Sequence, residues 1–193
     1  EAMAKAADIV QEERPRWQRL VVIVSALSGV TNLLLEGAHR AVGGDLTDAA
    51  NSEWRLRRMH GDLADALLAS PNRRDGVKWE IDRLIADFVN LCKAVNVVGE
   101  ASPRALDAVA SLGERMSVRL MAAVLQEQGV AAEWVEATRL IVTDKHFQDA
   151  HPDLPATRIQ AETVLGALFE RGVTPVVTGF VGAAPDGTVT TLG

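Results

Sequence analysis

The fold is decided by the stretch Val21-Val22-Ile23-Val24-Ser25-Ala26-Leu27-Ser28-Gly29-Val30-Thr31-Asn32-Leu33-Leu34. Together with Leu20, it opens on five consecutive aliphatic residues, four of them β-branched. A short run that is apolar on both faces predicts a fully buried strand of a parallel sheet. Small and polar residues follow the run, and apolar residues then recur at helical spacing. The pattern therefore predicts a strand, a tight turn and a helix.

The turn between this strand and helix is a candidate ligand site. In open α/β sheets, ligands bind at the carboxyl ends of the strands, and a helix N-terminus offers backbone N–H groups to an anion. Gly29 lets the backbone approach a ligand, and Ser25, Ser28 and Thr31 supply hydroxyl groups. The segment matches neither the Walker loop nor G-x-G-x-x-G. An alternative stays open, in which the turn binds nothing and its Ser and Thr side chains cap the helix.

The rest of the chain alternates helical and strand patterns, with one long helical stretch. We predict helices at 1–13, 30–42 and 102–128, a helix that begins near Pro152–Pro155 and ends at Gly172, and strands at 131–135, 140–143, 173–178 and 188–191. Alternating strands and helices predict a mostly parallel sheet that is covered on both faces. We therefore expect an α/β fold, a three-layer αβα sandwich, in a single domain of residues 1–193, with a helical hairpin inserted as an annex at 48–100.

Gly113 is an unusual residue for the interior of the 102–128 helix, where glycine costs about 1 kcal/mol relative to alanine. This cost indicates close packing, for which the loop around Ser28 and Gly29 is a candidate partner. Glu114 lies next to it, at the edge of the apolar face. A carboxylate there either pairs with a cation or stays in solvent beside Arg115, and the pattern alone leaves both open.

Composition excludes several classes of function. The formal charge of −6 argues against non-specific nucleic-acid binding, which needs clustered Lys and Arg. The sequence contains no apolar run of transmembrane length and no cluster of His or Cys typical of a transition-metal site. The single Cys92 fits a reducing compartment, and we expect it to be buried in a helix.

Four motifs, in the same order, resemble those of aspartate kinases in the amino-acid kinase family. The turn resembles S-A-x-x-G-[IV]-T-N-x-L, and the later segments resemble G-E-x-[ML]-S, G-F-[IV]-G and T-T-L-G. In this sequence the later three are Gly113-Glu114-Arg115-Met116-Ser117, Gly179-Phe180-Val181-Gly182 and Thr190-Thr191-Leu192-Gly193. They extend over nearly the whole chain.

The resemblance implies transfer of the γ-phosphoryl group of ATP, with Mg²⁺, to the β-carboxylate of L-aspartate, a first step toward lysine, threonine and methionine. It places Thr31 and Glu114 among the aspartate-binding residues, with Ser25 and Phe180 lining the same pocket and with Ser28 and Gly29 beside the phosphoryl group. It also implies a cytoplasmic enzyme and a homo-oligomer. The net charge and the lack of a transmembrane run predict neither nucleic acid nor a membrane as partner.

Two features of the family pattern are not found in this sequence. They are the N-terminal K-F-G-G-[ST]-S strand and the R-G-G-S-D segment that follows T-T-L-G, each of which carries a cation of the active centre. We therefore expect a fragment that contains the substrate side, without catalytic residues or a metal site of its own, and with negligible kinase activity. Two alternatives stay open: a non-catalytic aspartate-binding or assembly module, and an amino-acid kinase with another acceptor.

Overall fold

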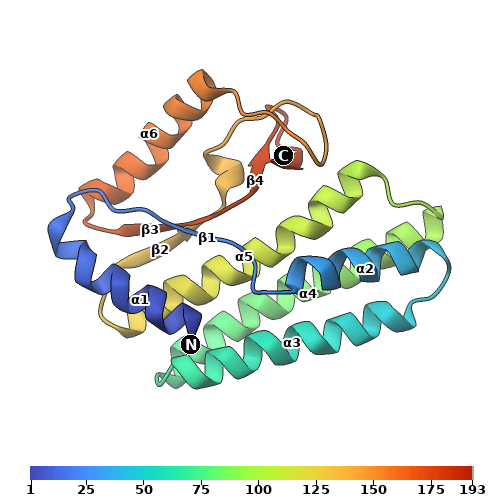
Figure 1. The fold of residues 1–193 in the computed structure, drawn as a ribbon, viewed down its shortest axis with the longest axis horizontal. Helices are drawn as coiled ribbons and strands as arrows, with labels where there is room; N and C mark the ends of the chain where they lie inside the picture. Colours follow the sequence, from blue (N-terminus) through green and yellow to red (C-terminus); the bar gives the residue numbers. More distant parts are fainter. Residues whose placement is uncertain (193) are drawn as a thin grey trace.

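The computed structural model describes residues 1–192, with helices around two small sheets (Figure 1). The helices are α1 (Ala2–Glu13), η1 (Arg14–Arg16), α2 (Val30–Val42), α3 (Thr47–Leu67), α4 (Pro71–Val98), α5 (Pro103–Glu127), η2 (Ala137–Arg139) and α6 (Leu154–Glu170). The strands are β1 (Val22–Val24), β2 (Ala132–Val135), β3 (Thr174–Thr178), β4 (Val181–Ala183) and β5 (Val189–Thr191).

The main sheet is parallel and has the order β1-β3-β2. Helix α5 packs on one face of it and α6 on the other, so that the sheet is the middle layer (Figure 1). Successive residues of β3 face opposite layers: Val176 belongs to the large core under α5, and Val177 to the smaller core under α6. The predicted αβα arrangement with a mostly parallel sheet is confirmed.

The prediction that the first strand is fully buried is wrong. β1 pairs only with β3 and forms an edge of the sheet within residues 1–192. Its central residue, Ile23, is 71% exposed, whereas Val22 and Val24 pack against the large core. The strand is therefore apolar on both faces, but the described residues cover only one of them.

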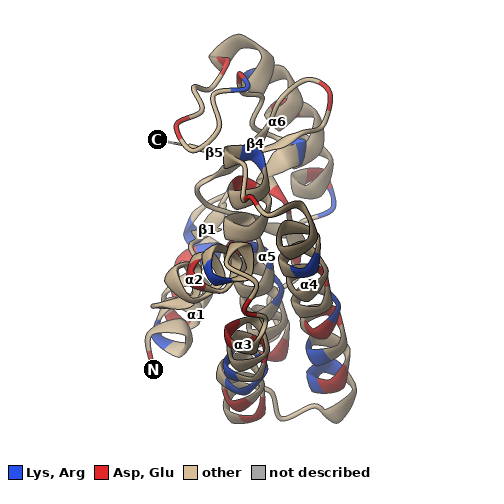
Figure 2. Cartoon of the chain, turned by 90° about the vertical axis from the view of Figure 1, so that its right-hand side faces the viewer, with Lys and Arg blue, Asp and Glu red and all other residues tan. Residues whose placement is uncertain are grey.

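Helices α2 to α5 pack against one another and form most of the large core. The two helices of 48–100 are α3 and α4, joined by a short connection, and Cys92 of α4 is fully buried. Burial raises the pKa of its thiol to about 11. Basic and acidic residues are interspersed along α3 and α4 (Figure 2), and the ion pairs Arg57–Asp82 and Lys78–Asp65 join the two helices.

The strand predicted at 140–143 does not form. The N–H of Ile141 donates to the carbonyl oxygen of Ala137 at 2.7 Å, and the N–H of Val142 donates to the Thr157 hydroxyl of α6 at 3.0 Å. Only isolated bridges involve Val142 and Thr143 in the described chain. By contrast, the hairpin strand predicted at 188–191 is β5, which pairs with β4.

Among the described residues, we find no helix that combines the length and the apolar character needed to cross a membrane.

Candidate functional site

The turn between β1 and α2 presents an uncapped helix N-terminus. Gly29, with φ of +80°, precedes the first residue of α2, and in the part of the chain that the structure describes no side chain hydrogen-bonds to this end of the helix. The capping by Ser or Thr side chains that the alternative expects is therefore not found in the described chain. The N–H of Val30 donates to the carbonyl oxygen of Leu27 at 2.9 Å, whereas the N–H groups of Thr31 and Asn32 stay available to an anion. Ser25, Ser28 and Gly29 are exposed beside them.

Gly113 allows α5 to lie directly against this turn. A Cβ atom at position 113 would lie 2.8 Å from the Cβ of Ala26 and 3.3 Å from Cγ1 of Val30. Neither distance leaves room for a methyl group. The close packing predicted from Gly113 is present, and its partners flank Ser28 and Gly29 on both sides.

Glu114 is a buried carboxylate, and its side chain is held over the turn. The residue is 4% exposed, and the N–H of Ala26 donates to its Oε1 at 3.3 Å. Its Oε2 is buried and has no hydrogen-bond partner among the residues described. Burial raises the pKa of this carboxyl group above its ordinary value, and the backbone hydrogen bonds oppose that shift only in part. The alternative in which Glu114 stays in solvent beside Arg115 is wrong, because Glu114 is buried. Arg115 pairs with Glu136 at 3.0 Å instead.

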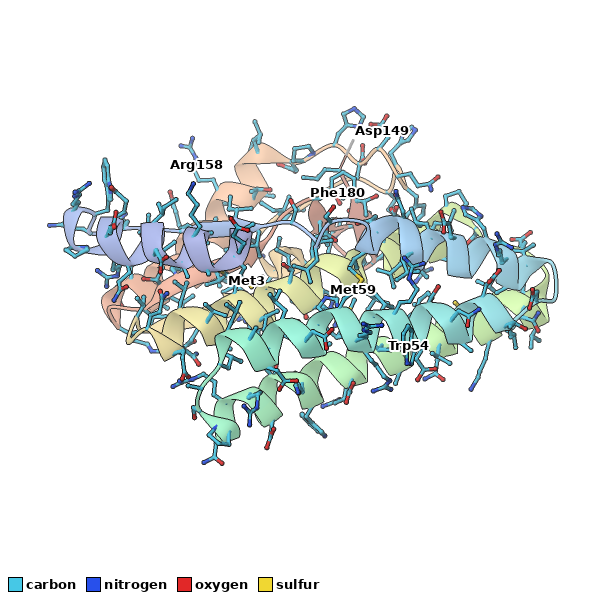
Figure 3. All side chains as sticks on the ribbon, turned by 60° about the horizontal axis from the view of Figure 1, so that its bottom comes forward. Met3, Trp54, Met59, Asp149, Arg158 and Phe180 are labelled. Carbon is cyan, nitrogen blue, oxygen red and sulfur yellow. The ribbon has the colours of Figure 1, made fainter. Side chains whose placement is uncertain are left out.

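Phe180 reaches the same region from the end of β3. The N–H of Gly179 donates to the carbonyl oxygen of Val24 at 2.8 Å, and a Cβ at 179 would lie 3.6 Å from Oγ of Ser25. Phe180 itself has φ of +60° and is 47% exposed. In Figure 3 it lies with the strands, apart from Trp54 and Met59 of α3. The carboxyl ends of β1 and β3 therefore present adjacent loops, as expected for parallel neighbours.

Contacts among α5, the turn and the end of β3 bring the candidate residues into one region. They are Ser25, Ser28, Gly29 and Thr31 of the turn, Glu114 of α5 and Phe180 after β3. Thr31 is half-buried in the first turn of α2. The region offers the buried carboxyl group of Glu114 beside hydroxyl groups and the N–H groups of Thr31 and Asn32. This combination suits a zwitterion, because an ammonium group and a carboxylate group each find a partner of opposite character.

The backbone N–H of Ala26 was not among the candidate groups of the sequence analysis. It orients the Glu114 carboxylate, and no side-chain pattern could reveal it because any residue except proline offers this donor. Within residues 1–192, no group of three or more His, Cys, Asp or Glu side chains is arranged to hold a metal ion.

Comparisons of this chain with known proteins agree on one family. The model of the amino acid kinase family matches residues 1–193. The chain is 31% identical over 193 residues to lysine-sensitive aspartokinase 3 of Escherichia coli, covering 100% of this chain and 40% of that protein. It is 35% identical over 203 residues to an aspartokinase of Schizosaccharomyces pombe, covering 98% of this chain and 37% of that protein. The chain thus spans about 40% of the length of such relatives.

Solved structures agree with the sequence relatives. The crystal structure of E. coli aspartokinase III in complex with aspartate and ADP superposes with a TM-score of 0.87 at 30% identity, covering 100% of this chain and 40% of that one. An aspartate kinase of Clostridium acetobutylicum superposes with a TM-score of 0.67 at 19% identity, over 97% of this chain and 37% of that one, a similarity of fold.

Proposed function

The chain belongs to the amino acid kinase family, and on that premise we propose that it forms the aspartate-binding part of an aspartate kinase. The reaction of such an enzyme is the transfer of the γ-phosphoryl group of ATP to the β-carboxylate of L-aspartate. Two observations support this assignment: relatives named aspartokinase align along the whole chain, and a similar structure was solved with aspartate and ADP.

The observation that carries the proposal is the unpaired oxygen of Glu114. A buried carboxylate oxygen without a donor is costly to the fold, and the cost is removed when a cation with N–H donors arrives. The α-ammonium group of L-aspartate has both properties. We therefore assign Glu114 to the ammonium group of the substrate, with the Ala26 N–H holding its other oxygen in place.

The turn supplies the complementary groups for the substrate's carboxylates. Thr31 can donate its hydroxyl to a carboxylate oxygen, and the uncapped N-terminus of α2 favours negative charge. We assign Ser25 and Phe180 to the walls of the same pocket. Ser28 and Gly29, which lack bulky side chains, leave space beside the substrate for the phosphoryl group.

Nucleotide binding and turnover need groups beyond those found here. Phosphoryl transfer depends on positioning and on neutralisation of phosphate charge. Among residues 1–192, no hydrogen bond or ion pair joins a Lys or Arg side chain to the candidate residues. Mg²⁺ enters the proposal only as the ion that accompanies ATP, because the described residues form no cluster of His, Cys, Asp or Glu that could hold it. We propose that residues 1–193 alone bind aspartate but have negligible kinase activity.

Calorimetric titration of L-aspartate into the chain tests the proposal. We expect binding by the wild type and loss of binding in both Glu114→Gln and Thr31→Ala. Glu36→Gln is the matched control, because Glu36 is an exposed glutamate of α2. Folding of each variant is checked by circular dichroism.

The outcomes separate the proposal from its alternatives. Folded wild-type protein that binds another amino acid in preference to L-aspartate would assign a different acceptor. Folded wild-type protein that binds no amino acid would refute the assignment of an aspartate site to this chain. Strong aspartate binding that persists in Glu114→Gln would refute the role of Glu114.

The proposal extends to the complete enzyme in two respects that rest on resemblance alone. We propose a homo-oligomer, which light scattering on the full-length protein tests by its mass. We also propose a cytoplasmic location, which fractionation of the source cells tests. Recovery of a monomer, or of the protein outside the cytoplasm, would contradict the respective statement.

A further inference from the structure

Asp107 of α5 is a second buried carboxylate, and unlike Glu114 it is well supplied with donors. It is 1% exposed and lies about two helical turns before Glu114. The N–H of Gln148 donates to both of its oxygens at 3.1 Å. Thr191 contributes two donors, its N–H to Oδ2 at 3.1 Å and its hydroxyl to Oδ1 at 2.7 Å.

These hydrogen bonds join segments that are far apart in the sequence. Gln148 belongs to the loop between η2 and α6 and has φ of +69°, and Thr191 ends β5. The carbonyl oxygen of Thr191 in turn accepts from the N–H of Ala150 at 3.0 Å. One carboxylate thus fixes both the loop and the strand to α5.

The strand held by Asp107 leads directly to the candidate site. Leu192, the next residue after Thr191, donates its N–H to the carbonyl oxygen of Phe180 at 3.0 Å. Phe180 has the left-handed backbone conformation noted above, which is unfavourable for a residue with a side chain. Such a conformation persists only where its surroundings hold it, and the Leu192 N–H is one of the groups that do so.

We propose, on the basis of the aspartate site proposed above, that Asp107 is a positioning residue for substrate binding. By fixing Thr191, it places the Leu192 N–H against Phe180 and so holds the wall of the aspartate pocket in its binding conformation. Asp107 does not touch the substrate. Its effect passes through two backbone links, the peptide bond from Thr191 to Leu192 and the hydrogen bond from the Leu192 N–H to the carbonyl oxygen of Phe180.

The first test compares Asp107→Asn with Asp149→Asn. Asparagine at 107 replaces one acceptor oxygen by an NH₂ group, which faces the N–H donors of Gln148 and Thr191 without accepting from either. Asp149 is an exposed residue of the same loop (Figure 3) and undergoes the same chemical change. We expect Asp107→Asn to weaken aspartate binding about tenfold, the effect of losing a hydrogen bond to a charged group, and Asp149→Asn to leave it unchanged.

The second test changes only the hydroxyl donor and protects against a failure of Asp107→Asn to fold. Thr191→Val removes the hydroxyl but keeps the backbone N–H, and Thr191→Ser keeps both. We expect valine to weaken aspartate binding about fivefold and serine to restore binding to within about twofold of wild type. Amide hydrogen exchange at Leu192 should accelerate in the valine variant and not in the serine variant.

These measurements distinguish a positioning role from a purely structural one. A purely structural role predicts that Thr191→Val lowers thermal stability while the folded protein keeps the wild-type dissociation constant, and that result would overturn the inference. Equal aspartate affinity in Asp107→Asn and Asp149→Asn would overturn it as well. If the folded wild type binds no aspartate, the proposed function itself fails. That result differs from one in which the wild type binds aspartate and Asp107→Asn binds it equally well, which overturns only the role of Asp107.

Discussion

Replacing Glu114 by glutamine is expected to stabilise the chain at neutral pH while it abolishes aspartate binding. The glutamine oxygen can still accept from the N–H of Ala26, as Oε1 does at 3.3 Å. Its amide group takes the place of Oε2, which is buried without a partner in the described chain. The substitution therefore exchanges a buried, unpaired charge for a neutral polar group of nearly the same shape.

The magnitude follows from the burial of the side chain. At 4% exposure, Glu114 has little solvent to offset its charge, and an unsatisfied buried group costs about 1–3 kcal/mol, with charged groups above that range. The glutamine NH₂ group keeps part of this cost, so we expect a net gain of about 1 kcal/mol. For a chain of this size, that gain raises the melting temperature by about 2–4 °C.

The stability difference between Glu114→Gln and the wild type is expected to depend on pH. Because the pKa of Glu114 is raised in the folded state, folded protein holds this proton more tightly than unfolded protein does. Stability is therefore lost as pH rises from the ordinary glutamate value, about 4.3, through the folded pKa. The advantage of Glu114→Gln should be near zero at about pH 4, should grow with pH, and should level off above the folded pKa.

The assay is thermal unfolding of both proteins across this pH range, with Glu36→Gln as control. A surface substitution such as the control should change stability by no more than about 0.5 kcal/mol. The reasoning is refuted if Glu114→Gln melts below the wild type at neutral pH, or if its advantage is independent of pH.

Three further predictions follow from the same site. Gly113→Ala should lower the midpoint of urea unfolding. The added methyl group crowds Ala26 and Val30, which costs about 1–3 kcal/mol, whereas the higher helix propensity of alanine stabilises by only about 1 kcal/mol. An unchanged or higher midpoint would contradict the close approach of α5 to the turn. Aspartate affinity of the wild type should rise as pH increases through the raised pKa of Glu114, because the ammonium group needs the ionised carboxylate. Calorimetry upward from the ordinary pKa of glutamate, about 4.3, to about pH 8 measures this, and a flat profile would count against it. Residues 1–193 incubated with ATP, Mg²⁺ and aspartate should yield no aspartyl phosphate above background when product is trapped with hydroxylamine; formation at the rate of a full-length enzyme would show that this chain holds all the catalytic groups.

Local patterns were sufficient to predict the parts of the fold that depend on neighbours in sequence. The helix beginning at Ser102-Pro103 is α5, where the Ser102 hydroxyl accepts from the N–H of Ala105 at 3.3 Å. The strand–turn–helix at 22–42 has the predicted order, and Gly113 was correctly associated with close packing. In each case, the signal lies within a few residues.

The errors concern features that depend on distant partners. Ile23 is exposed because α6 packs mainly against β3 and leaves this face of β1 largely uncovered among the described residues. The segment 140–143 lacks strand structure because the Val142 N–H bonds to Thr157 of α6 instead of to a strand. Neither partner can be read from the residues of the segment itself.

Two features of the site could not be predicted from the sequence, for the same reason. Oε2 of Glu114 is buried without a partner among the described residues only because α5 lies against the turn and buries the side chain. Asp107 gave one faint signal, an acidic residue next to the buried position of Leu106, but its partners at Gln148 and Thr191 are 41 and 84 residues away. Burial and long-range partners require the assembled fold.

The central claim is that the buried Glu114 carboxylate recognises the ammonium group of L-aspartate. Succinate tests it most directly, because it keeps both carboxylates of aspartate and lacks only that group. We predict that the wild type binds L-aspartate at least about tenfold more tightly than succinate, as expected for a charge-assisted hydrogen bond to a buried group, and that Glu114→Gln binds L-aspartate no more tightly than succinate. Equal affinity of the wild type for the two ligands, or a preference that survives in Glu114→Gln, would contradict the claim.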